Sequence, residues 1–337
     1  MARERKRTPP AAVAPASANA ESEVNAEHVP IAVQVGERGD LNRYLQRDIP
    51  AVVHKQSFLM NEWQAFLTGL MFFTRLPCPM WVDHNLYWLS QSTVYFPLLG
   101  VIVGLFGAAA AAVGTLLWHP AVGVLMSTLA TVWLTGAFHE DGVADSFDAF
   151  GGGWTRAEIL RIMKDSRIGT YGAVGLLLVM GTKITALSLL LVPAAGSVAA
   201  AVVWSPMVLV VGHVMGRWAC VYLLYAHEYI DEAGSAAPGK QFVLSVSYAR
   251  LVAGTVSAFV FTLAALGLER IRVVAGVWVV CTVATVYAGH YIESIIGGVL
   301  GDALGAANQI IELIAYLVMA MRPIDAIVAD LFAALAP

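Results

Sequence analysis

The sequence predicts an all-α, polytopic integral membrane protein, a helical bundle with about 6–8 transmembrane helices. Of the 337 residues, 58% are hydrophobic and only 13% are charged, and the mean hydropathy is +0.69. Soluble domains are usually about 45–50% apolar, and here the excess is arranged in long runs. Those runs are expected to be helical because lipid offers an open backbone no hydrogen-bond partner. The formal net charge of −4 gives no indication of nucleic-acid binding.

The first 57 residues differ from the rest. They begin with a basic stretch, residues 3–7, and continue with a stretch rich in Ala, Pro and Ser. No apolar segment follows the basic start, so we expect a disordered cytoplasmic extension rather than a secretory signal. A targeting peptide or an added extension stays open. Residues 58–337 form the predicted membrane domain.

The membrane domain begins with residues 58–73, which are apolar at helical spacing. This segment is shorter than the roughly 20 residues that a span needs, so it predicts a helix lying in the membrane interface. A first span extended by its neighbours stays open. The later apolar runs are six credible spans and two short C-terminal ones, at about 93–117, 121–138, 171–192, 197–225, 251–267, 273–299, 309–321 and 324–336.

The polar segments predict the orientation of the chain. The loop 139–170 carries Arg156, Arg161, Lys164 and Arg167, so the positive-inside rule places it in the cytoplasm. Counting spans from there puts the polar segments 226–250 and 301–305 on the same side. We therefore expect a multi-pass protein of the cytoplasmic (inner) membrane, with its site facing the cytoplasm.

The most informative stretch is residues 139–148, between two apolar runs. On a helix, Asp141, Asp145 and Asp148 fall at i, i+4 and i+7, so the three carboxylates project from one face. Like charges on one face repel each other unless a cation lies between them, and Mg²⁺ prefers oxygen ligands. The pattern predicts a Mg²⁺ site at the membrane edge. A solvated, charged helix start is the alternative.

A basic segment follows at once. Lys164 and Arg167 can neutralise phosphate charge, and Arg does so through a planar fork. Ser166, Thr170 and the nearby glycines can add neutral donors. An ordinary positive anchor that only fixes topology is the alternative.

Several ionisable residues lie inside apolar runs. Lys183 is deep in the run 171–192, where a charge costs about 2.5–3.5 kcal/mol, so it should face the bundle interior and meet an anion. His213 and Arg217 are i, i+4 partners, and Arg217 fits an interfacial role as well as a catalytic one. His290 and Glu293 lie one turn apart and could pair structurally.

The last motif is the glycine-rich stretch 297–306. Its four glycines allow close approach of a backbone or ligand, and Asp302 adds a carboxylate on the predicted cytoplasmic side. Glu312 lies ten residues further on, in the next apolar run. A packing seam with one solvated Asp is the alternative.

Together these segments resemble the cobalamin synthase family, the adenosylcobinamide-GDP ribazoletransferases. The matching pieces run in the family's order over roughly residues 62–320, and the fourth is the most specific. They are Phe72–Pro77, Tyr95–Gly100, His139–Asp145, Met163–Gly172 and Gly301–Ala306. Family members often carry Glu where this chain has Gln309, which leaves Glu312 as the candidate carboxylate of the last helix.

The resemblance implies a transferase of substituted phosphate groups. Its substrates would be adenosylcobinamide-GDP and either α-ribazole or α-ribazole 5′-phosphate. Its products would be GMP and either adenosylcobalamin or adenosylcobalamin 5′-phosphate. Its cofactor would be Mg²⁺. On this reading Asp141, Asp145 and Asp148 hold the metal, and Asp302 is a second ligand or the base, so that Asp141, Asp145 and Asp302 are the catalytic set. The expected substrate-binding residues are Lys164, Asp165, Ser166, Arg167, Thr170 and Lys183.

Two other classes of membrane protein share some of these features. A CDP-alcohol phosphotransferase also spaces aspartates on a helix, but Ala144-Asp145 stands where its signature has Ala-Arg. An ion-coupled transporter would place carboxylates near the membrane midplane, whereas most acidic residues here lie at the predicted span ends. Assembly into a homo-oligomer, or association with other cobamide-assembly enzymes, stays open.

Overall fold

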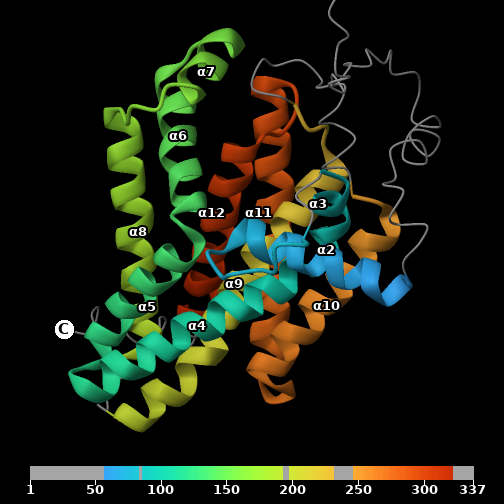
Figure 1. The fold of residues 1–337 in the computed structure, drawn as a ribbon. Helices are drawn as coiled ribbons and strands as arrows, with labels where there is room; N and C mark the ends of the chain where they lie inside the picture. The colour runs from blue at the N-terminus through green and yellow to red at the C-terminus, as the bar shows by residue number, and fades with distance from the viewer. Residues whose placement is uncertain (1–56, 83–85, 193–196, 231–245, 322–337) are drawn as a thin grey trace, which may run out of the picture. The chain divides into compact units, whose positions relative to one another are not determined.

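The computed structural model describes residues 57–82, 86–192, 197–230 and 246–321, all within the unit Val35–Pro337. The predicted N-terminal extension 1–57 and the short apolar run 324–336 therefore lie almost wholly outside the described residues. Within them the chain is helical (Figure 1). The elements are α2 (Phe58–Phe73), α3 (Leu86–Ser92), η2 (Thr93–Tyr95), α4 (Phe96–Leu117), α5 (Pro120–Thr135), α6 (Phe138–Gly152), α7 (Arg156–Met163), α8 (Thr170–Leu191), α9 (Val198–Ala226), α10 (Tyr248–Leu266), η3 (Leu268–Arg270), α11 (Ile271–Ile296) and α12 (Gly301–Ala320).

Length and hydropathy identify six membrane-spanning candidates in the described chain, or seven if one bent helix pair forms a span. This confirms the polytopic all-α class. The six stretches are Tyr87–Leu117, Thr170–Leu191, Val198–Ala226, Tyr248–Leu266, Leu268–Ile296 and Gly301–Met319. The helix at 58–73 is confirmed with the predicted bounds, while its place in the interface stays a prediction.

The predicted span 121–138 is wrong as a single straight helix. α5 ends at Thr135, and α6 leaves it at an angle of 89°. The cause is local: Gly136 and Ala137 both adopt left-handed backbone conformations, with φ of 70° and 60°. Gly136 does so at little cost, but Ala137 is the one described non-glycine residue with positive φ. This strained corner sets the direction of the acidic helix.

Two helices, α9 and α12, organise the packing around the site. α9 contacts α4, α10 and α12, and α12 also contacts α6, α8 and α11. Glycines bring the backbones together: a Cβ at Gly100 would lie 2.6 Å from the His213 carbonyl oxygen, and one at Gly216 would lie 2.6 Å from that of Asn308. Figure 1 shows α6, α8 and α12 side by side, with α4 and α5 crossing their lower ends.

The start of the last described helix also differs from the prediction. The sequence predicts a short apolar segment at 309–321, after the glycine-rich stretch 297–306. Instead α12 begins at Gly301 and continues to Ala320, long enough for a span. Asp302 therefore lies in the first turn of a helix, where a negative charge interacts favourably with the helix dipole.

Candidate active site

The acidic face of α6 meets the first turns of α12. The helix predicted for the three aspartates is present, with Asp141 exposed and Asp145 and Asp148 half-buried. Gly142 provides the contact, because a Cβ there would lie 2.6 Å from the Asp302 carbonyl oxygen and 3.2 Å from the Gly305 Cα. The glycine thus lets the start of α12 approach α6 closely. The structure brings Asp302 to the aspartates of α6, as the sequence predicted.

These carboxylates act on one another. Asp145 is partly desolvated and experiences Coulombic repulsion from Asp141, Asp302 and Asp148. Within the described chain, no ion pair joins Asp141 or Asp145 to a Lys or Arg. An all-oxygen donor set with excess negative charge suits a hard divalent cation such as Mg²⁺. The residues present therefore fit the cofactor that the sequence implied.

Asp148 has a different environment from the other two aspartates. Its Oδ2 accepts a hydrogen bond from the Gly169 amide at 2.6 Å, and its Oδ1 accepts one from the Gly172 amide at 2.8 Å. Asp148 thus caps the N-terminus of α8. A Cβ at either glycine would collide with this carboxylate. The metal role expected for Asp148 stays a prediction, since both of its oxygens already hold backbone donors.

The basic segment lies between α7 and α8, tied to the acidic helix by Asp148. Lys164, Ser166, Arg167 and Thr170 are exposed. Arg167 forms a forked ion pair with Asp165, Nε to Oδ1 at 2.9 Å and Nη2 to Oδ2 at 2.6 Å. Hydrogen bonds from Arg167 lower the pKa of Asp165 to about 2, so this carboxylate stays ionised at neutral pH. The fork expected to hold phosphate is occupied by a neighbouring side chain.

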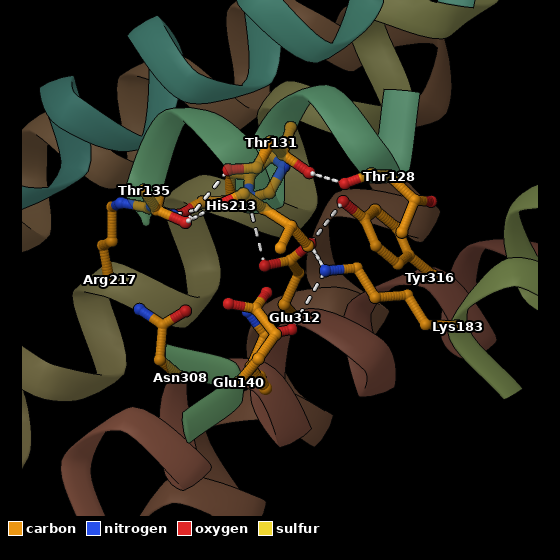
Figure 2. Close-up of polar contacts among 12 residues, drawn as sticks. Thr128, Thr131, Thr135, Glu140, Lys183, His213, Arg217, Asn308, Glu312 and Tyr316 are labelled. Carbon is orange, nitrogen blue, oxygen red and sulfur yellow. Dashed lines mark hydrogen bonds and ion pairs between the residues drawn. The ribbon is translucent and has the colours of Figure 1, made fainter. Parts of the chain in front are cut away.

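Lys183 lies deep in the bundle, as expected, and meets the predicted anion. Its Nζ is 2.7 Å from Glu312 Oε1, and the two side chains are 2% and 0% exposed. Figure 2 shows Lys183 from α8, His213 from α9 and Tyr316 from α12 all directed at Glu312. The Tyr316 hydroxyl donates to Glu312 Oε1 at 3.0 Å. His213 Nδ1 lies 3.0 Å from Glu312 Oε2, close enough for an ion pair but outside hydrogen-bond geometry.

The network around Glu312 reaches the acidic helix through Gln309. Gln309 Oε1 accepts from Lys183 Nζ and its Nε2 donates to Glu140 Oε1, both at 2.9 Å. Position 309, for which the sequence offered no role, is therefore a bridge. Glu140 was missed because its partners come from distant helices. Its only sequence signal was a carboxylate beside Asp141 at the end of an apolar run.

Arg217 belongs to the same buried network. It is 1% exposed, so the bundle encloses it, and the interfacial and catalytic roles considered for it stay predictions. Its Nη1 donates to the His213 carbonyl at 3.2 Å and lies 3.4 Å from His213 Nδ1, which confirms the i, i+4 pairing. Polar atoms without a hydrogen bond in the described chain give the network unused donor and acceptor capacity beside the acidic helix. They include His139 Nε2, Glu140 Oε2, His213 Nε2, Arg217 Nε and Asn308 Oδ1.

An apolar cavity of about 390 Å³ lies between α6, α8, α11 and α12. Phe147 and Phe150 of α6, Tyr291 of α11 and Ile310 of α12 are among its lining residues. Phe150 follows Asp141 by nine residues, about two and a half helical turns, so the two side chains leave opposite faces of α6. The cavity is therefore separate from the acidic face.

Comparison with known proteins identifies the family. The family model of cobalamin-5-phosphate synthase matches residues 65–320. The chain belongs to this family. Adenosylcobinamide-GDP ribazoletransferase of Shewanella amazonensis is 36% identical over 263 residues, covering 78% of this chain and 97% of that protein. The proteins of the same name from Shewanella sp. (strain W3-18-1) and Shewanella oneidensis are each 37% identical, covering 77% of this chain and 94% of theirs. No solved structure matches the chain.

The cobalamin-5-phosphate synthase match extends from within α2 to the end of α12. It therefore contains the acidic face, the capped start of α8 and the buried network around Glu312. Residues 1–64 precede it.

Proposed function

We infer that this chain is an adenosylcobinamide-GDP ribazoletransferase acting in cobalamin biosynthesis. Its substrates are then adenosylcobinamide-GDP and α-ribazole or its 5′-phosphate, and its second product is GMP. The observation that carries the proposal is the meeting of α6 and α12, which brings Asp302 to Asp141 and Asp145 beside the exposed basic segment. Carboxylates for a metal and cations for phosphate are what pyrophosphate chemistry requires.

We assign Asp141 and Asp145 as the residues that hold Mg²⁺, with Asp302 beside them as a further ligand or as the base. The metal, when bound, would neutralise charge on the pyrophosphate and its leaving group. Asp148 keeps the start of α8, and with it the basic segment, against the acidic helix. Arg167 and Lys164 are exposed and can turn toward phosphate oxygens. For Arg167 this requires exchanging Asp165 for the ligand, a small cost because exposed ion pairs are weak.

The group transfer is then a single displacement. A ribose hydroxyl oxygen of α-ribazole attacks the phosphorus that carries the cobinamide group, and the bond from this phosphorus to the bridging oxygen breaks. GMP leaves with the electron pair of that bond. The hydroxyl proton passes to a nearby carboxylate, for which Asp302 is the candidate. Buried Lys183 is placed to support the helices rather than to touch phosphate.

The activity test is GMP release by the purified protein supplied with adenosylcobinamide-GDP, α-ribazole and Mg²⁺. We expect release to stop on chelation and to resume when Mg²⁺ is restored. Asp141→Asn should lower kcat at least about a hundredfold, since it removes an anionic metal ligand. Glu269→Gln, an exposed carboxylate outside the acidic face, is the matched control and should match wild type. Activity of Asp141→Asn within about threefold of wild type would remove this residue from the site.

We also propose that the acidic face opens to the cytoplasm across the inner membrane. The basic residues of α7 and the following loop support this orientation. The test starts from Cys78→Ala, because Cys220 and Cys281 are buried. With Lys164→Cys or Trp118→Cys added, an impermeant thiol reagent should label intact cells only at position 118. Labelling of position 164 from outside would reverse the orientation.

A further inference from the structure

A second group of metal-ligating side chains lies where α9 and α11 end, outside the acidic face. His227 is the C-cap residue of α9, and His290 and Glu293 lie one turn apart on α11. One ligand atom from each of the three residues can be chosen so that all lie within 4.8 Å of one another. The phosphate chemistry proposed above uses none of them.

The local geometry is close to that of a metal site. His227 Nδ1 is 3.1 Å from Glu293 Oε2, and the His227 and His290 rings meet edge to face with centroids 5.4 Å apart. Tetrahedral Zn²⁺ with bonds of about 2.0–2.1 Å holds its ligand atoms roughly 3.3 Å apart. The His227–Glu293 pair is therefore already near that spacing, and His290 offers a third ligand atom within 4.8 Å. Because the His290 side chain is exposed, it is free to adjust its position toward a metal.

The backbone positions the buried member of the group. A Cβ at Gly289 would collide with His227 Nε2, so the glycine lets this imidazole lie against α11. Nε2 is thereby directed at the Gly289 backbone, and Nδ1 is left to face Glu293. His227 itself is only 8% exposed.

We propose that His227, His290 and Glu293 form a site for a divalent transition metal of the zinc class, separate from the acidic face. Two imidazoles and one carboxylate are a known zinc ligand set, whereas Mg²⁺ prefers oxygen ligands alone. His290 is exposed, so the group lies at the surface of the bundle, where a metal can enter.

The metal would fasten the chain segment that leads to Asp302. Just after His227, the Glu228 carbonyl accepts from the Val299 amide at 2.8 Å, and the Ile230 amide donates to the Val299 carbonyl at 2.9 Å. These two bonds hold residues 228–230 beside the short connection between α11 and α12. Joining α9 to α11 at His227 would therefore fix the start of α12. The three residues act in this way as positioning residues.

The simpler alternative is a hydrogen-bonded His227–Glu293 pair without a metal. It accounts for two of the three side chains and gives His290 no role. The alternatives differ in a measurable way, because an ion pair alone retains no metal and does not depend on His290.

The experiment uses the full chain purified in detergent, stripped with a chelator and titrated with Zn²⁺ or Co²⁺. We expect wild type to retain about one equivalent of Zn²⁺ per chain after dialysis, and Co²⁺ to give the visible absorption of a tetrahedral site. His290→Ala and Glu293→Gln should weaken Zn²⁺ binding by at least about tenfold. Glu228→Gln, an adjacent exposed carboxylate, and Asp141→Asn, from the acidic face, should keep wild-type binding.

Stability gives a second readout that does not depend on activity. With Mg²⁺ kept in the buffer, a zinc-selective chelator should lower the melting temperature of wild type but leave that of His290→Ala unchanged. If wild type retains no metal, the group is an ion pair only and the proposal fails. It also fails if His290→Ala binds as tightly as wild type, or if Asp141→Asn abolishes the binding.

Discussion

Substituting Lys183 tests whether the deepest cation of the bundle is structural. In Lys183→Met the side chain keeps its approximate length and loses its charge, so among the described residues buried Glu312 keeps Tyr316 and His213 as direct neighbours. Arg217 then interacts with it only through space. The side-chain oxygen Oε1 of Gln309 also loses the hydrogen bond that Lys183 Nζ donates to it. Removing one partner of a buried ion pair typically costs about 3–5 kcal/mol. With both groups at most 2% exposed, we expect a loss in this range.

The measurement is unfolding of the purified protein in mixed micelles by increasing SDS, followed by tryptophan fluorescence. Lys164→Met is the matched control, because it makes the same substitution at an exposed position and should change stability little. The double variant Lys183→Met/Glu312→Gln removes both charges. It should lose less than the sum of the single variants, by at least about 2 kcal/mol.

Kinetics separates this role from phosphate binding. If Lys183 is structural, the folded Lys183→Met protein should keep its KM for adenosylcobinamide-GDP within about threefold. A KM raised at least about tenfold with unchanged stability would refute the reasoning and return Lys183 to the substrate-binding set.

Three further predictions concern the junction of α6 and α8. Asp148→Asn weakens the cap on α8 and should lower the free energy of unfolding by about 1–2 kcal/mol. The same SDS titration measures this, and an unchanged stability would show that the cap is not needed. Arg167→Lys keeps the charge but loses the planar fork, so kcat/KM in GMP release should fall at least about tenfold. Arg161→Lys is the control and should leave kcat/KM nearly unchanged. Equal, small effects of the two substitutions would mean that Arg167 only helps to set the membrane topology. Arg156 cannot serve as that control, because its Nε donates to the Ile296 carbonyl. Because the pKa of Asp165 is lowered in the folded protein, its contribution to stability is present above its unfolded pKa and is lost as the pH falls through about 2. Asp165→Asn and wild type should therefore show parallel pH profiles of stability between about pH 5 and 8. Profiles that diverge in this range would contradict the ion pair.

The sequence predicted a helix correctly where a single local pattern, such as residue spacing on one helix face, decides the structure. Apolar spacing predicted the bounds of α2, and the i, i+4, i+7 aspartates predicted the helix α6. The bend at Gly136 and Ala137 was missed, because the apolar pattern continues through it and left-handed alanine has no sequence signal. The early start of α12 was not predicted, because the apolar pattern begins only at about residue 309, whereas the close approach that the glycines predicted is present.

The site was predictable where the chemistry is local to one segment. The cost of burying a charge predicted that Lys183 would meet an anion, but only the packing of α8 against α12 shows that the anion is Glu312. The structural use of Asp148 could not be predicted either, since its donors lie at the start of α8, 21 and 24 residues away. His227 joins His290 and Glu293 only through the packing of α9 on α11.

Gln309 explains why the acidic face and the buried network depend on each other. Its amide both accepts from Lys183 and donates to Glu140, which an ionised Glu at this position could not do, because a carboxylate only accepts. With Gln here, the network contains two carboxylates, Glu140 and Glu312, and two cations, Lys183 and Arg217, so its formal charges balance. Glu140 immediately precedes Asp141, and Gln309 lies on the same helix as Asp302. The hydrogen bond from Gln309 to Glu140 therefore joins α12 to α6 beside the acidic face, and it helps to fix the position at which Asp302 meets Asp141 and Asp145.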